Sequence, residues 1–320
     1  MVEQRKLIRL GNSSFAIALP KGWIDKAGLK KGDNIFISPN ANGELIIMPS
    51  PLEKTNGKER IIDLKDKNLE NIKKEIRAAY IRGYTSFIIK GIKSKDEKNE
   101  IKKILADFLS FELIESNGDE IIAKDFFNLD DANLSNFIRR MDNNIREISE
   151  IVLEEIKKDK INPHKIKEVE DIDKDVNKFY FLCSRIFLIG TDNPTILTSL
   201  KTSGLRIFNE WWIAFHLEAL ADNLKYLLRL FQKMDVKKEE KEKIEEVCGE
   251  LREAYKKGMD SFYKEDTKLA LEVMDITHRI NEDLIKLEKQ LPHLLRIIMI
   301  LNEMKRQIYQ NAKMVSYIKY

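Results

Sequence analysis

The chain has 320 residues, 43% of them hydrophobic and 34% charged, which is enough for two or three globular domains. Lysine and arginine outnumber aspartate and glutamate by 56 to 53, a formal net charge of +3. No apolar run is long enough to cross a bilayer, and the N-terminus lacks the apolar core of a signal peptide. Cys183 and Cys248 are isolated, which argues against disulfide and zinc sites. These features predict a cytoplasmic protein with no transmembrane segment.

Residues 1–50 predict a small β-rich head. Phe15, Ile17 and Leu19 alternate with small residues, the period of a half-buried strand. Pro20 ends this strand and opens a short helix that Gly28 terminates. Residues 35–37 and 44–48 then flank a hairpin connection at residues 40–43. Because so short a segment buries little surface alone, we expect it to fold as a homodimer.

The charge of this head favours an anionic partner. Residues 1–50 contain seven basic and four acidic side chains, so their excess of +3 equals that of the whole chain, and the rest of the chain is balanced. A dimer that carries all the net positive charge is typical of proteins that bind phosphates.

Three segments of the head, RLGNS at residues 9–13, LPK at 19–21 and LKKGD at 29–33, resemble the swapped-hairpin DNA-binding domain of the AbrB and SpoVT family. The resemblance implies a two-fold dimer that binds double-stranded DNA. The side chains that it implies as DNA contacts lie in the first strand, the turn and the helix start: Arg5, Lys6, Arg9, Asn12, Ser13 and Lys21. The alternative is a dimerisation or toxin-partner module that does not touch DNA.

A polar linker at residues 50–57 leads to a segment with changing periodicity. We expect strands near residues 60–64, 85–92, 111–115 and 120–124, with helices near 68–81 and 95–109. This order, βαβαββ, predicts a small α/β module over residues 58–125. It contains no phosphate loop, catalytic pair or metal-ligand spacing, so it is either a connector or a small-ligand sensor.

From residue 129 onward the pattern is helical. We expect helices near residues 133–158, 163–189, 199–232, 237–263, 266–291 and 292–317, joined by short connections as in antiparallel bundles. The motif EVxDI at residues 168–172 recurs at 272–276, an offset of 104 residues. The repeat predicts tandem three-helix bundles over residues 129–234 and 235–320, or a duplicated scaffold with no further role.

Acidic side chains on two of these helices point to a cation site. Glu218 and Asp222 are spaced i, i+4 and therefore project from one helix face. Asp173 and Asn177 share a similar polar face on the preceding helix. Oxygen ligands on adjacent helices suit a hard or borderline cation. The alternative is a solvated helix face, and His216 nearby is more typical of an ordinary core or surface residue.

The segments EVEDIDKDVNKFYFLCSR (168–185) and HLEALADNLKYLL (216–228) resemble the PhoU family of phosphate-uptake regulators. That family has tandem three-helix bundles whose E/D-x-x-x-D motifs hold metal ions. The resemblance implies a divalent or iron-type ion in the first bundle only, because residues 277–281 and 303–307 keep one carboxylate. The implied ligands are Asp173, Asn177, Glu218 and Asp222.

Together these features predict an α+β multidomain protein with a swapped-hairpin β head (1–50), an α/β module (58–125) and two PhoU-like helical bundles (129–234 and 235–320). By resemblance we expect a dimeric DNA-binding regulator of phosphate uptake whose helical body senses or docks on the phosphate transport or signalling machinery. The alternative is a metal-binding signalling adaptor that docks on a phosphate ABC transporter without binding DNA. Because the sequence shows no nucleophile–base pair or complete hydrolase motif, we do not expect an enzyme.

Overall fold

The structure is a computed structural model that describes residues 3–39, 43–50, 58–65, 67–129 and 132–317. The chain divides into two compact units, Met1–Lys54 and Thr55–Tyr320. The predicted hairpin connection at 40–42 and the linker at 51–57 lie outside the described residues. No helix in the described part of the chain combines the length and the apolar character that a membrane span requires.

The first unit consists of two β-hairpins and a short helix. Its elements are β1 (Ile8–Leu10), β2 (Ser14–Ala16), α1 (Lys21–Lys26), β3 (Phe36–Pro39) and β4 (Leu45–Met48). β1 pairs with β2 and β3 with β4, both antiparallel, as separate two-stranded sheets. The strand predicted through Leu19 is wrong in length, because β2 ends at Ala16, opposite Ile8. Pro20 precedes α1 and Gly28 follows it with a φ of +69°, as the sequence predicts.

None of the side chains that the structure describes in residues 3–37, 39 and 43–50 is buried. Many of its large apolar residues are exposed, and Phe15, for example, keeps 62% of its surface, whereas others such as Trp23 and Ile24 are half-buried. Two-stranded hairpins have little stability of their own in water. The unit therefore lacks the apolar core that would stabilise it as an isolated single copy.

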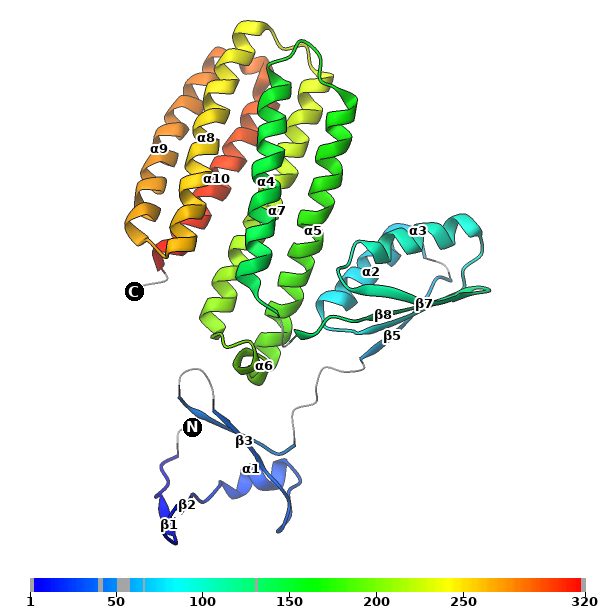
Figure 1. Ribbon diagram of the computed structural model, residues 1–320, viewed down its shortest axis with the longest axis vertical. Helices are drawn as coiled ribbons and strands as arrows, with labels where there is room; N and C mark the ends of the chain where they lie inside the picture. The colour runs from blue at the N-terminus through cyan, green and yellow to red at the C-terminus, as the bar shows by residue number, and fades with distance from the viewer. Residues whose placement is uncertain (1–2, 40–42, 51–57, 66, 130–131, 318–320) are drawn as a thin grey trace. The chain divides into compact units, whose positions relative to one another are not determined.

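The second unit opens with the predicted α/β module. Its elements are β5 (Glu59–Asp63), α2 (Leu69–Ile81), β6 (Ser86–Lys90), α3 (Lys95–Ala106), β7 (Phe111–Asn117) and β8 (Glu120–Asp125). The sheet order is β5-β6-β8-β7, with β5 and β6 parallel and the other pairs antiparallel. Helices α2 and α3 cover one face of this sheet (Figure 1). The expected order βαβαββ is confirmed.

Long helices form the rest of the second unit. They are α4 (Leu134–Ile156), α5 (Pro163–Asp192), α7 (Gly204–Lys233), α8 (Lys238–Lys264), α9 (Thr267–Gln290) and α10 (Leu295–Tyr317). Four start at side chains that accept a hydrogen bond from a backbone N–H of the first turn: Asn133, Asn162, Ser203 and Asp266. Figure 1 shows α4, α5 and α7 side by side, and α8, α9 and α10 beside them. One continuous apolar core runs through all of these helices.

The chain departs from the predicted helix ends between α5 and α7. The helix expected near residues 163–189 continues to Asp192 as α5. The short helix α6 (Pro194–Ser199) and a separate start at Gly204 replace the single helix expected from residue 199. Lys201 adopts a φ of +50° and Ser203 caps α7, so the chain turns between the two helices.

The α/β module is joined to the helical body by a buried arginine. Arg185 of α5 pairs with Asp125 at 2.7 Å, and both side chains are nearly fully buried. Its guanidinium also donates to the carbonyl oxygens of Tyr80 and Tyr84 at 3.0 and 2.9 Å. Between them Gly83, at a φ of +86°, brings the chain so close to Ile189 that a Cβ would lie 2.9 Å from its Cδ1. The contact fixes the end of α2 against α5.

Candidate functional site

The turn between β1 and β2 is held by one of the predicted DNA contacts. Arg9 donates from Nε to the carbonyl of Gly11 at 3.1 Å and from Nη2 to the carbonyl of Asn12 at 3.4 Å. Gly11 has a φ of +75°, a conformation that favours glycine. Asn12 and Ser13 are exposed at the tip of this turn. Arg9 thus has a structural role in the turn besides any contact with a ligand.

The other predicted contacts are exposed cations around this hairpin and α1. Arg5 forms an ion pair with Glu3, whereas Lys6 and Lys21 form none with the residues that the structure describes. The basic side chains that the structure describes in residues 3–50 are all exposed: Arg5, Lys6, Arg9, Lys21, Lys26, Lys30 and Lys31. An exposed set of cations with few carboxylates attracts a polyanion, and salt shortens the distance over which this attraction acts.

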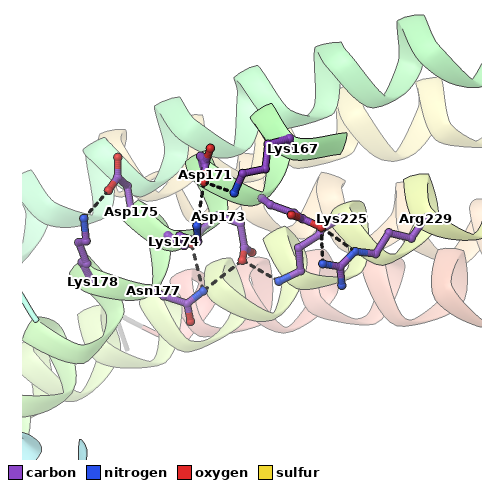
Figure 2. Close-up of polar contacts among 10 residues, drawn as sticks. Lys167, Asp171, Asp173, Lys174, Asp175, Asn177, Lys178, Lys225 and Arg229 are labelled. Carbon is purple, nitrogen blue, oxygen red and sulfur yellow. Dashed lines mark hydrogen bonds and ion pairs between the residues drawn. The ribbon is translucent and has the colours of Figure 1, made fainter. Parts of the chain in front are cut away.

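The predicted cation site of the first bundle is occupied by a lysine. Lys225 of α7 extends its Nζ to Asp173 Oδ2 at 2.6 Å and to Asp222 Oδ1 at 2.5 Å. Asn177 donates from Nδ2 to the carboxylate of Asp173 at 3.3 Å and to its carbonyl at 3.0 Å. Figure 2 shows Asp173 between Asn177 and Lys225. The structure therefore brings three of the four predicted ligands together, around an ammonium group that the prediction had left out.

The electrostatics of this cluster follow from its burial. Burial alone would lower the pKa of Lys225, but its hydrogen bonds with Asp173 and Asp222 raise it above the ordinary value. Burial and the charges of Asp222 and Asp173 raise the pKa of Glu218 to about 7. Glu218 makes no hydrogen bond or ion pair with the described residues. Near neutral pH Glu218 is therefore partly protonated, so the cluster does not hold four fixed charges.

These side chains do not fit the divalent or iron-type ion that the resemblance implies. The described residues contain no group of three or more His, Cys, Asp or Glu side chains arranged to hold a metal ion. The Lys225 ammonium already balances Asp173 and Asp222, so the repulsion that would favour a metal is relieved. His216 lies in the core against Trp212 and Phe215, where burial lowers its pKa to about 4.

The two residues of the corresponding motif in the second bundle have different surroundings. Gln307 is buried and accepts a hydrogen bond from Asn223 of α7 at 3.2 Å. Glu303 is exposed and bonded to Arg306.

Sequence reasoning missed Lys225 and Arg185. Both resemble surface charges in a chain that is one-third charged. The spacing of Lys225 from Asp222, i, i+3, was a signal for the first. No pattern in the sequence marks the partner of Arg185, since Asp125 lies sixty residues away at the end of β8.

The comparison with protein families matches the first unit. Residues 8–55 match the family described as antidote-toxin recognition MazE, bacterial antitoxin. A search of curated proteins found no match. The prediction of an AbrB-type N-terminal domain is thus confirmed to the extent that residues 8–55 are similar to a MazE/AbrB-type domain. The chain joins a segment similar to a MazE/AbrB-type domain to an α/β module and a mostly helical body.

Proposed function

We propose that the protein is a DNA-binding regulator whose N-terminal units pair as a homodimer on double-stranded DNA. The proposal rests on the family match and the net charge of this unit. It matches an antitoxin-type family over residues 8–55, and its charge excess of +3 is that of the whole chain. In a dimer that excess doubles on one surface, which favours binding to the DNA backbone.

The exposed apolar side chains of the unit support the dimer. Residues that would form a core in a larger fold are 51–67% exposed: Leu7, Ile8, Leu10, Phe15, Ile17, Ile37 and Leu45. Apolar clusters of this kind on a small unit mark a protein interface. A second copy supplies the missing core, and the swapped hairpins that the sequence predicts are one way to do so.

The helical body is the basis for proposing which process the protein regulates. Its resemblance to the PhoU family supports a regulator of phosphate uptake that acts in the cytoplasm, either by repressing transport genes or by docking on the transporter. In this proposal the protein is not an enzyme. The ion pairs of Lys225 with Asp173 and Asp222 weigh against the alternative of a metal-binding adaptor that acts without DNA.

The test is binding of the full chain to a duplex from upstream of its own gene, by fluorescence anisotropy over a range of salt concentrations. Lys6→Ala or Lys21→Ala removes two phosphate contacts per dimer, so each should flatten the log–log salt slope by about 1.8, at about 0.9 per phosphate. Lys286→Ala is the matched control, because this exposed lysine lies on α9 and pairs only with Asp283. It should leave the slope unchanged.

Two outcomes would contradict the proposal. One is a dimeric full chain that has no affinity for any duplex at low salt. The other is binding whose salt slope is insensitive to both substitutions in the first unit, which would place the contact elsewhere. A chain that instead captures a toxin-like protein through this unit would support the module that does not touch DNA.

A further inference from the structure

A polar groove lies between α9 and α10, in the half of the helical body opposite to the Lys225 cluster. Its volume is about 480 Å³ and it is open to solvent. Its lining is made of hydrogen-bonding side chains with one carboxylate: Thr277, His278, Asn281, Asn302, Glu303, Lys305, Arg306, Tyr309 and Gln310. This groove has a basic character, whereas the first bundle has carboxylates.

The internal repeat explains how this reversal of charge arises. The motif at Glu218 and Asp222 has its counterpart at Glu303 and Gln307 in the second bundle. On the facing helix, the offset of 104 makes Asp173 correspond to Thr277. The second bundle thus keeps one carboxylate where the first has three, and Lys305 and Arg306 lie beside it.

Lys305 is the centre of the groove. Its side chain is half-buried, and its Nζ donates to Asn281 Oδ1 at 2.5 Å. Burial lowers the pKa of Lys305, and the charge of Glu303 only partly opposes this effect. Within the described residues, this amide oxygen is its sole hydrogen-bond acceptor. A partly desolvated ammonium with two protons to spare is stabilised by an anion.

The neighbouring arginine adds a second cation with free donors. Arg306 donates from Nε and Nη2 to Glu303 Oε2 at 2.9 and 2.6 Å. This leaves Arg306 Nη1 free to donate a hydrogen bond to a ligand. It also leaves Glu303 Oε1 free to accept a hydrogen bond from a ligand. The pair therefore offers both a donor and an acceptor at the edge of the groove.

We propose that the groove between α9 and α10 binds a small tetrahedral oxyanion that carries a proton, such as hydrogen phosphate. Lys305 and Arg306 neutralise its charge, and the Asn302 and Tyr309 side chains complete its hydrogen bonds. Glu303 accepts a hydrogen bond from the P–OH group of the ligand, which selects phosphate over sulfate because sulfate has no proton to donate near neutral pH. The proposal is independent of DNA binding, since none of these residues belongs to the first unit.

The test is calorimetric titration of the full chain with inorganic phosphate and with sulfate at constant ionic strength. We expect saturable binding of phosphate that weakens about tenfold or more in Lys305→Gln and in Arg306→Gln, as the loss of a charge-assisted hydrogen bond predicts. Arg296→Gln is the matched control, because it removes an exposed cation from α10 outside the groove, and it should bind phosphate as the native chain does.

Glu303→Gln tests the selectivity. The native chain should prefer phosphate to sulfate, and the variant should bind the two anions equally well. Thermal unfolding of each variant establishes that it folds, and Arg306 is exposed enough for its replacement to be tolerated. Absence of saturable phosphate binding, or binding that survives both Lys305→Gln and Arg306→Gln, would overturn the proposal. Equal affinity of the native chain for sulfate would overturn the role of Glu303.

Discussion

At the scale of single residues, the cluster between α5 and α7 shows how one lysine changes the chemistry of a group of carboxylates. Asp173 is buried, and its Oδ1 has no partner among the described residues, so its charge depends on Lys225. Glu218 has no such partner and keeps its proton to higher pH. The sequence identified the right carboxylates, but it could not assign their counter-charge, because that depends on the rotation of two helices about their axes.

The titration of Glu218 predicts a pH-dependent stability. Its pKa is about 7 in the folded chain, against an ordinary value of 4.5. Between these pH values the unfolded chain releases the proton and the folded chain retains it, so the free energy of unfolding falls as pH rises. Glu218→Gln removes this fall, and the variant should be more stable than the native chain above pH 7 by up to about 3 kcal/mol.

Urea denaturation of both chains at pH values from 4 to 8 measures this difference. The two should coincide near pH 4, where Glu218 is protonated in the folded and the unfolded state, and diverge toward pH 7. Glu288→Gln is the control, because this glutamate is exposed on α9 and should show no divergence. A constant difference at all pH values would mean that the substitution acts through packing instead.

At the scale of secondary structure, capping residues in the sequence predict where helices start. They do not predict which side chains of neighbouring helices touch. Asn133, Asn162 and Asp266 each cap a helix within about one residue of the predicted start, because a capping side chain acts on its own first turn. The boundary at Ser203 was missed, since the same residue type occurs at 199. The contact of Gln307 with Asn223 was not predicted, because it depends on packing, which sequence spacing does not specify.

Replacing Arg185, at the junction of the α/β module with α5, should affect both the end of β8 and the end of α2. Arg185→Lys keeps the charge, but a single ammonium cannot reach Asp125 and both carbonyls of α2 as the guanidinium does. The unfolding free energy should fall by about 3 kcal/mol, the usual effect of breaking a buried ion pair. Hydrogen exchange at the end of α2 should become faster.

Arg206→Lys serves as the control for this experiment. Arg206 also forms an ion pair, with Glu210, but more than half of its side chain is exposed. Its replacement should change the unfolding free energy by less than about 1 kcal/mol. Unchanged exchange at the end of α2 in Arg185→Lys would show that apolar contacts, such as that of Phe181 with the core of the module, are enough to hold the junction.

At the scale of the whole molecule, the two units differ in what their sequences could reveal. The second unit contains its own core, so its periodic apolar residues predicted helices and strands that the structure confirms. The first unit has the same kind of apolar pattern, yet none of its described side chains is buried in a single copy. An apolar pattern predicts that side chains are buried, but they can be buried against another chain. A single sequence does not say which of the two occurs.

The final prediction follows from that contrast. Phe15→Ser in the full chain should shift the sedimentation of a dimer toward that of a monomer and weaken DNA binding in parallel, while the helical body unfolds at its native temperature. The matched control is Phe126→Ser, because Phe126 is 61% exposed against 62% for Phe15 but belongs to the second unit. The equilibrium should also depend on protomer concentration in the native chain, because in the proposed dimer the core of the first unit forms only when two copies meet. A monomeric native chain, or a Phe15→Ser variant that stays dimeric and bound to DNA, would show that the exposed side chains of the first unit do not form the interface.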